Sequence, residues 1–151
     1  MVLKIGDLAP DFTLPSDTKD QITLSHLRGQ KVLLYFYPKD NTPGCTKEAC
    51  DFRDHFGSFI NQSIKIFGIS KDTPETHAKF KKKYNLPFTL LTDQDANVCE
   101  AYGVVNTKSL FGKTFLGIER STFLIDEKGL ISAMWRKVKV TQHVEHIING
   151  L

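Results

Sequence analysis

The sequence predicts an α/β fold in which helices flank a central mixed β-sheet. The run Val32–Tyr37 is continuously apolar and bounded by turn formers, as expected of a strand buried on both faces, and the largely apolar run Ile64–Ile69 predicts a second buried strand. A helical pattern follows each run. Strands that alternate with helices in this way favour a sheet with helices packed against it.

The chain begins with a predicted β-hairpin. Asp11–Leu14 and Ile22–Leu24 are short alternating segments, and the turn-rich stretch Pro15–Asp20 separates them. Ser25 is a candidate cap for a short turn that ends at Gly29.

Two helices are predicted around the second buried strand. The segment from Thr46 to about Asn61 has helical spacing and predicts a single helix. Thr73 is placed to cap another helix, which has Pro74 as its first residue and runs to Tyr84. The apolar side of the first helix is expected to consist of Ala49, Phe52, Phe56, Phe59 and Ile60.

The second half of the chain predicts a third strand, a short helix, a second hairpin and a final helix. We expect the final helix to bury an apolar stripe. The four elements are a strand at Phe88–Leu91, a helix at Ala96–Tyr102, a hairpin of Ser121–Ile125 with Leu130–Met134, and a helix at Thr141–Ile148. The stripe is made of Val140, Val144, Ile147, Ile148 and Leu151.

The composition is that of an ordinary globular protein, with 40% hydrophobic and 25% charged residues. A chain of 151 residues predicts one domain, residues 1–151, which folds without disulfides. Lys4 and Asp7 interrupt the N-terminus before an export signal could form, and no apolar run is long enough to span a bilayer. Three cysteines, an odd number, do not suggest a secreted disulfide framework. We therefore expect a cytoplasmic protein that does not enter a membrane.

The net charge of +3 is mild, and its densest cluster is Lys79–Lys83. One short cluster has a small electrostatic footprint, so it is interpreted as a solvated helix face. Binding to an acidic partner is the minor alternative, and no nucleic-acid partner is expected.

Cys45 is the candidate nucleophile. It follows the Pro43-Gly44 turn, in the first turn of the helix that comes after the strand Val32–Tyr37. Unpaired amides and the helix dipole stabilise an anion there and favour the thiolate. The alternative is a buried, inert cysteine at a helix start. The ordering provided by Pro38, Thr42, Pro43 and Gly44 argues for a reactive thiol.

Activating the thiolate alone does not make a fast enzyme. A cysteine whose pKa falls from about 8.5 to about 6 gains about 30-fold in thiolate fraction at neutral pH, but loses about tenfold in nucleophilicity. The site must therefore also stabilise charge on the electrophile. The Gly44 and Cys45 amides, the Thr42 hydroxyl and the Arg120 guanidinium are the candidate donors.

The segment YFYPKDNTPGCTKEACDFRD contains Pro38-x-x-x-Thr42-x-x-Cys45 and closely resembles the active-site motif of the peroxiredoxins. More narrowly, it is similar to the bacterioferritin comigratory protein (peroxiredoxin Q) subfamily. GDLAPDFTL, GISKD and FGKTFLGIERSTFLIDEKG extend the resemblance over nearly the whole chain. The resemblance implies a thioredoxin-like fold and thiol-dependent reduction of hydrogen peroxide and organic hydroperoxides. It also implies recycling by a thioredoxin-type dithiol, a role in antioxidant defence and no cofactor.

The resemblance also implies roles for individual residues. Cys45 matches the peroxidatic cysteine and Cys50 the resolving cysteine. Thr42 and Arg120 match the residues that orient and polarise the peroxide, and Pro38 matches the proline that shields the site.

Two further positions bear on the resemblance to this subfamily. Glu48 matches a commonly acidic position, for which we expect a supporting role. Val105 departs from the subfamily, which often carries an aromatic residue there; this bears on loop packing and not on the chemistry.

Five residues along a helix separate Cys45 from Cys50, which places their Cα atoms about 8.6 Å apart. A disulfide tolerates at most about 7 Å between Cα atoms. If Cys45 becomes a sulfenic acid and condenses with Cys50, the first turns of the helix must unwind. The chain ends soon after its last helix without a cysteine-bearing arm, so we expect a monomer.

The third cysteine and two histidines are weaker candidates for functional residues. Cys99 is interpreted as a buried packing residue, with a back-up resolving role as the alternative. His143 and His146 have metal-pair spacing, but no third ligand is evident nearby, and surface histidines are common. The spacing of Cys45 and Cys50 is also wider than zinc clips favour, so no metal is expected.

Two rival functions remain open. A thioredoxin-like disulfide reductase would share the fold, but those enzymes use C-x-x-C and this chain has C-x-x-x-x-C. A non-enzymatic copper or redox-sensing carrier would also use two cysteines. A peroxide-consumption assay with a thioredoxin system separates the three functions.

Overall fold

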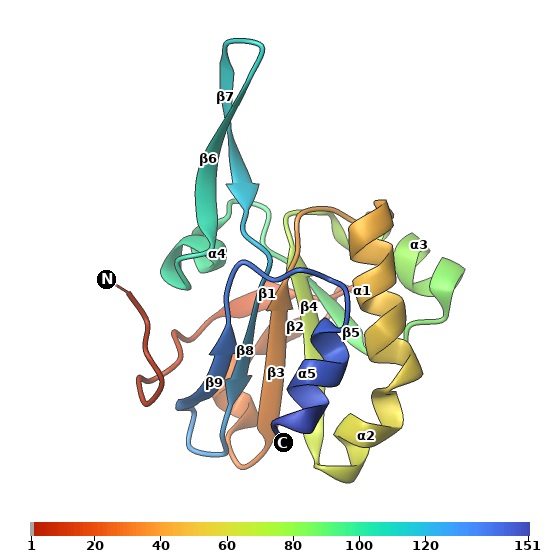
Figure 1. Ribbon diagram of the computed structural model, residues 1–151, viewed down its shortest axis with the longest axis vertical. Helices are drawn as coiled ribbons and strands as arrows, with labels where there is room; N and C mark the ends of the chain where they lie inside the picture. Colours follow the sequence, from red (N-terminus) through yellow and green to blue (C-terminus); the bar gives the residue numbers. More distant parts are fainter. Residues whose placement is uncertain (1) are drawn as a thin grey trace.

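A computed structural model describes residues 2–151. Its centre is a five-stranded mixed sheet of order β5-β4-β3-β8-β9 (Figure 1). β3, β4 and β5 are parallel to one another, whereas β8 is antiparallel to β3 and β9 is antiparallel to β8. This confirms the predicted fold class. The strands are β3 (Lys31–Phe36), β4 (Ile64–Ser70), β5 (Thr89–Thr92), β8 (Ser121–Ile125) and β9 (Ile131–Trp135).

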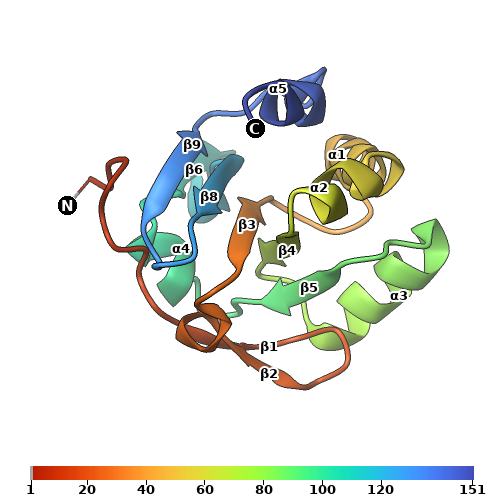
Figure 2. The same ribbon diagram turned by 90° about the horizontal axis from the view of Figure 1, so that it is seen from below.

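The two faces of the sheet are covered by different elements (Figure 2). One core packs α1 (Pro43–Asp54), α2 (Phe56–Asn61), α3 (Pro74–Tyr84) and α5 (His143–Asn149) against the sheet. The other core contains residues of the N-terminal segment and of α4 (Asn97–Ala101). The N-terminal segment includes the predicted hairpin, β1 (Thr13–Pro15) with β2 (Gln21–Thr23), and the 3₁₀ turn η1 (Leu24–Leu27).

β3 shows why the sheet needs two cores. Because successive side chains of a strand point to opposite faces, Leu33 and Tyr35 enter the core with α1, while Val32, Leu34 and Phe36 enter the core with α4. All five side chains are at most 1% exposed. The continuous apolar run therefore marks the strand at the centre of the sheet.

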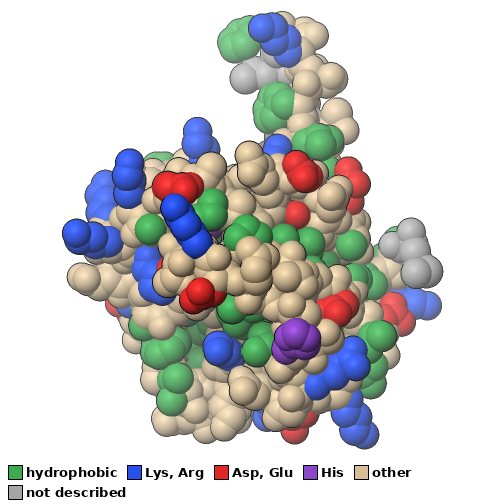
Figure 3. Space-filling model, turned by 180° about the vertical axis from the view of Figure 1, so that it is seen from behind, with side chains coloured by type: hydrophobic (Ala, Val, Ile, Leu, Met, Phe, Trp, Pro, Cys, Tyr) green, Lys and Arg blue, Asp and Glu red, His purple; other side chains and the backbone are tan. Residues whose placement is uncertain are grey.

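The helix predicted after Thr73 has the bounds expected from its cap. α3 begins at Pro74, and the Thr73 hydroxyl accepts a hydrogen bond from the Thr76 backbone N–H at 3.2 Å. Lys and Arg side chains gather over the edge of the molecule where α3 lies (Figure 3). Lys79 and Lys82 are exposed, as the solvated-face interpretation requires.

The prediction of one helix from Thr46 to Asn61 was wrong. α1 starts three residues earlier, at Pro43, and the helix is interrupted at His55. The His55 ring nitrogen Nδ1 lies 2.9 Å from the Asp51 carbonyl, which also accepts the His55 backbone N–H. Gly57 weakens the helix just beyond this point. The break turns Ile60 outward, so that it is 55% exposed.

A hairpin that the sequence patterns did not predict projects from the sheet (Figure 1). It pairs β6 (Val105–Leu110) with β7 (Lys113–Ile118) through the turn Phe111–Gly112, where both residues have positive φ. β7 is exposed along most of its length, so it lacks the buried face that periodicity detects. Val105 packs at the margin of the core that contains α4.

The last helix begins at His143, two residues later than expected. His143 is buried, contrary to the interpretation as a surface histidine, and its Nε2 lies 2.8 Å from the Thr122 hydroxyl. Burial is the main reason that its pKa is lowered to about 4. Among residues 2–151, no helix has both the length and the apolar character needed to cross a membrane.

Candidate active site

The chemistry-bearing residues meet at the carboxyl edge of the parallel strands. β3 leads through the loop of residues 37–42 into α1, which carries Cys45 and Cys50. Arg120 directly precedes β8, and the antiparallel register pairs Ser121 with Phe36 at the end of β3. Residues 75 positions apart in the chain are thereby brought into contact.

Cys45 is the third residue of α1 and is only 2% exposed. The first intrahelical bond runs from the Thr46 N–H to the Thr42 carbonyl at 2.8 Å. A helix start of this kind leaves the Gly44 and Cys45 amides without acceptors inside the helix. Gly44 also gives space to the guanidinium, because a Cβ there would lie 3.3 Å from Arg120 Nη2.

Arg120 joins the thiol to a buried carboxylate. Its Nη2 donates to Cys45 Sγ at 3.3 Å, and its Nη1 donates to Glu48 Oε1 at 2.6 Å. The Glu48 side chain is fully buried, while that of Arg120 remains 15% exposed. Glu48 therefore orients the guanidinium, whose other edge faces the sulfur.

The charges of this cluster are strongly coupled. Burial raises the pKa of Glu48 to about 7, although the nearby Arg120 opposes the shift. Burial alone would lower the pKa of Arg120, but the charges of Glu48 and Cys45 outweigh it and raise that pKa. The guanidinium thus stays charged beside the sulfur, where a thiolate and a developing oxyanion both need a positive partner.

The loop before α1 holds the other two predicted site residues. Thr42 is the N-cap residue, yet its hydroxyl donates to the Lys39 carbonyl at 2.8 Å rather than capping the helix. Pro38 is exposed and borders a hollow of about 340 Å³ with residues of β7. Cys45, Thr42 and Arg120 do not line this hollow, so the shielding role of Pro38 stays a prediction.

Cys50 lies two turns into the same helix and is only partly buried. Partial burial raises the pKa of its thiol. Since α1 is continuous from Pro43 to Asp54, helix geometry keeps the two Cα atoms about 8.6 Å apart, which is too far for a disulfide. Both thiols are free in this conformation.

Cys99 is separated from this cluster by the sheet. It belongs to the core with α4, whereas Cys45 belongs to the core with α1 (Figure 2). Burial, followed by a hydrogen bond to Asp93, raises the pKa of the Cys99 thiol far above its usual range. The packing interpretation of Cys99 fits this environment.

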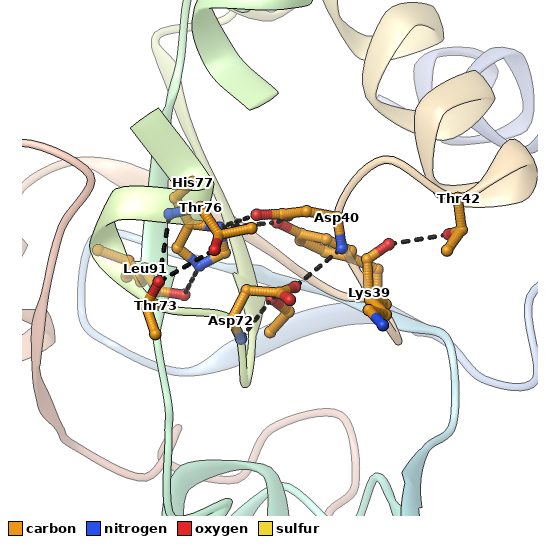
Figure 4. A network of polar contacts seen from close by, with 10 residues as sticks. Lys39, Asp40, Thr42, Asp72, Thr73, Thr76, His77 and Leu91 are labelled. Carbon is orange, nitrogen blue, oxygen red and sulfur yellow. Dashed lines mark hydrogen bonds and ion pairs between the residues drawn. The ribbon is translucent and has the colours of Figure 1, made fainter. Parts of the chain in front are cut away.

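Sequence reasoning undervalued Glu48 and missed a buried network behind the loop. Glu48 follows Cys45 by three positions and precedes the buried Ala49, so a carboxylate on the apolar side of the helix was the available signal. The missed network joins Asp40, Asp72 and His77 (Figure 4). No periodicity indicates such a network, because its members come from three separate segments.

Comparison with known proteins agrees with this geometry. The AhpC/TSA family model matches residues 5–134. The chain is 50% identical to peroxiredoxin Bcp of Bacillus subtilis over 151 residues, which is all of this chain and 96% of the relative.

Solved structures give the same result for the fold. Peroxiredoxin Q from Xylella fastidiosa, solved as a cysteine-to-serine variant, aligns with a TM-score of 0.92 and 36% identity, covering 99% of this chain and 96% of that one. The bacterioferritin comigratory protein of Xanthomonas campestris, which has alkyl peroxide reduction activity, aligns with a TM-score of 0.90 and 38% identity over 99% and 95% of the two chains.

The fold and the cysteine–arginine site define a thiol-dependent peroxidase on a thioredoxin-like scaffold. The chain belongs to the AhpC/TSA family and, within it, to the peroxiredoxins of the bacterioferritin comigratory protein (peroxiredoxin Q) type. The predicted family, fold and class of activity are thereby confirmed. Peroxiredoxins of this type use a hydroperoxide as oxidant and a thioredoxin-type dithiol as reductant.

Proposed function

We propose that Cys45 is the peroxidatic cysteine of this enzyme and that Arg120 is its main electrostatic catalyst. The observation that carries the proposal is the 3.3 Å contact between Arg120 Nη2 and Cys45 Sγ. Glu48 orients the guanidinium by accepting a hydrogen bond from its other terminal nitrogen, Nη1. The Cys45 thiolate attacks one peroxide oxygen and the O–O bond breaks. Cys45 becomes a sulfenic acid, and the leaving alkoxide or hydroxide takes a proton. Arg120 stabilises the charge that moves onto these oxygens.

Thr42 and Pro38 complete the site in this proposal. Because the single hydroxyl proton of Thr42 is donated to the Lys39 carbonyl, its oxygen can only accept. It therefore accepts a hydrogen bond from the O–H group of the hydroperoxide and orients it. Pro38 forms the rim that limits water access. Because only 2% of Cys45 is exposed, the proposed substrates are hydrogen peroxide and small alkyl hydroperoxides.

We further propose that Cys50 resolves the sulfenic acid through an intramolecular disulfide. The Cys50 thiol displaces the sulfenic oxygen as water, and a dithiol reductant then restores both thiols. The first turns of α1 must unwind for this step. Phe52 limits the unwinding, because its ring is fully buried and stacks on Tyr35 at a centroid distance of 4.6 Å.

Three further aspects of the proposal concern the whole molecule. We propose that the enzyme acts as a monomer, since a disulfide within one helix needs no cysteine from a second subunit. We also propose a cytoplasmic location, where a thioredoxin system supplies electrons. Residues 1–151 are proposed to act as one domain. Light scattering on the reduced and oxidised protein tests the first of these points.

The proposed mechanism is tested by peroxide consumption coupled to thioredoxin, thioredoxin reductase and NADPH under anaerobic conditions. We expect wild-type turnover and a Cys45–Cys50 disulfide by mass spectrometry. Cys50→Ser should consume about one equivalent of peroxide in the first turnover and stop without forming that disulfide. A Cys45–Cys99 disulfide in the wild type would transfer the resolving role. Insulin reduction without peroxide consumption would indicate a disulfide reductase instead.

A further inference from the structure

A buried polar network lies behind the active-site loop (Figure 4), and none of the hydrogen bonds that Asp40, Asp72 and His77 make within residues 2–151 goes to Cys45 or Cys50. Its centre is Asp40, whose carboxylate accepts from the Tyr37 hydroxyl at 2.5 Å and lies 2.7 Å from Nδ1 of His77. The side chains of Asp40 and His77 are fully buried. The second ring nitrogen of His77, Nε2, lies 3.0 Å from the Leu91 carbonyl. The network thus ties the loop to α3 and β5.

The hydrogen bonds determine the net charge of this pair. A carbonyl oxygen only accepts, so Nε2 of His77 must carry a proton. The short contact between Nδ1 and the carboxylate then holds one further proton, on either the ring or Asp40. In both arrangements the Asp40–His77 pair has no net charge. The pair is therefore suited to holding the loop in place, and adds no net charge behind the thiolate.

The second arm of the network reaches the catalytic loop through one peptide group. Asp72 Oδ2 accepts from the Ser70 hydroxyl at 2.6 Å and from the Asp40 backbone N–H at 2.8 Å. The carbonyl of that same peptide group belongs to Lys39, and it accepts the Thr42 hydroxyl at 2.8 Å. Because a peptide group is planar, fixing its N–H also fixes the direction of its C=O.

We propose that Asp72 and His77 are positioning residues for the Thr42 hydroxyl. Asp72 holds the N–H of the Lys39–Asp40 peptide, while His77 holds the Asp40 side chain. Together they orient the Lys39 carbonyl, which takes the Thr42 proton and leaves the Thr42 oxygen as an acceptor toward the hydroperoxide. This inference rests on the role proposed above for Thr42. It adds two residues, from the β4–α3 loop and from α3, to the machinery of the first oxidation.

The decisive measurement compares two reactions of the same thiol. Oxidation of Cys45 by hydrogen peroxide, measured by competition with horseradish peroxidase, requires an oriented substrate. Alkylation of Cys45 by iodoacetamide, followed by mass spectrometry, requires only an accessible thiolate. We expect Asp72→Ala and His77→Phe to lower the peroxide rate by about tenfold or more, as small misplacements of positioning groups do. Their alkylation rates should stay within about twofold of wild type, since the variants leave Arg120 and the helix start in place.

A double-mutant cycle connects the network to Thr42. Thr42→Val should itself slow peroxide oxidation. Asp72→Ala should then have almost no further effect in the Thr42→Val background, because the group that it positions is already gone. Additive losses would overturn the inference while leaving the role of Thr42 intact. A Thr42→Val protein with wild-type peroxide kinetics would instead overturn the proposed role of Thr42, and the inference with it.

Further variants distinguish a positioning role of the network from an effect of the Asp40 charge and from a general loss of protein stability. Asp40→Asn preserves the geometry, since its amide oxygen accepts from Tyr37 and its NH₂ donates to a neutral His77. It should react nearly as wild type, whereas Asp40→Ala should behave like His77→Phe. Leu24→Ala is the stability control, because Leu24 is buried in η1 on the other face of the sheet. It should lower the melting temperature without changing the peroxide rate.

Two results would contradict the proposed positioning role of Asp72 and His77. Equal losses of peroxide and alkylation rates in His77→Phe would show a general loss of structure. A slow Asp40→Asn variant, in which the contacts with Tyr37 and His77 are kept and the pair still has no net charge, would show that the ionisable carboxylate itself, and not the geometry, matters. If Asp72→Ala does not fold, His77→Phe supports the same comparison, because it acts on the loop from α3.

Discussion

Cys45 and Cys99 occupy the same position in their helices but have opposite electrostatic surroundings. Each is the third residue of its helix, α1 or α4, and each is at most 2% exposed. Next to Cys45, the Arg120 guanidinium lies 3.3 Å from the sulfur. In α4, the Asp93 carboxylate accepts the backbone N–H groups of Val98 at 3.2 Å and Cys99 at 2.7 Å.

The difference shows what a helix N-terminus contributes to a thiol. Its amides favour an anion only while they are available. In α4 a carboxylate already occupies them, and burial and that carboxylate raise the pKa of Cys99. In α1 no side chain caps the helix, and a guanidinium is added. Free amides together with a cation therefore distinguish the proposed peroxidatic site from the surroundings of Cys99.

The largest effect that tests this comparison is the removal of each sulfur. Cys45→Ser should abolish thioredoxin-coupled peroxide turnover, because a serine hydroxyl cannot supply the anionic nucleophile. Cys99→Ser, the matched control, should retain wild-type turnover once its loss of stability is allowed for. Turnover in Cys45→Ser that disappears in the double variant would assign the reactive role to Cys99.

The next largest effect concerns the cation. Arg120→Met should slow the first oxidation by about 10²–10³-fold, as removing a donor to a developing oxyanion does. Arg120→Lys should lose less, because it keeps the charge but not the forked contact with Glu48 and Cys45. Stopped-flow rates are compared with a thiolate titration at 240 nm. A loss explained entirely by the thiolate fraction would show that Arg120 acts on the nucleophile alone.

Glu48 gives a pH-dependent test of the buried side of the site. Its pKa is about 7 in the folded protein and near 4.5 when the chain is unfolded. The unfolded state therefore binds fewer protons between these values, and the free energy of unfolding falls as the pH rises through them. A shift of this size corresponds to a loss on the order of 3 kcal/mol.

Urea unfolding of the wild type and of Glu48→Gln at pH 4.5, 6 and 8 measures this loss. Glutamine does not titrate, so the wild type should lose stability relative to the variant between pH 4.5 and 7 and not beyond. Parallel curves for the two proteins would mean that the Glu48 carboxylate has an ordinary affinity for protons in the fold.

How much of the fold and of the candidate site could be predicted from the sequence depends on how far apart the interacting residues lie along the chain. Cys45 and its helix start are local features, and the apolar runs at Val32–Tyr37 and Ile64–Ile69 marked the buried strands. The contact of Arg120 with Cys45 depends on the antiparallel pairing of β8 with β3. Periodicity only suggested that contact, and the family motif supplied the role.

The sequence-based predictions of helices and strands failed in two situations. In one, a polar side chain contacts a backbone carbonyl; in the other, a strand has no buried face. The Asp51–His55 contact that accompanies the break after α1 is an example of the first kind. The β6–β7 hairpin is an example of the second, since the side chains of β7 do not alternate between core and solvent. The network of Asp40, Asp72 and His77 combines residues from a loop, a second loop and a helix. Each of these residues looks like an ordinary surface polar residue in the sequence.

The smallest expected effect asks which of two causes keeps Cys99 inert. Burial is the largest single cause of the raised pKa of Cys99, and the hydrogen bond to Asp93 comes next. Asp93→Ala removes the acceptor for two amides of α4 and should cost about 1–2 kcal/mol of stability, as the loss of a capping residue does. Cys99 should nevertheless stay far slower than Cys45 toward iodoacetamide in the native protein, because the side chain remains in the core. Site-resolved labelling by mass spectrometry, together with urea unfolding, measures both quantities. If Cys99 in Asp93→Ala is alkylated as fast as Cys45, the carboxylate rather than burial keeps it unreactive, and a freed helix start would be sufficient to activate a thiol without a guanidinium.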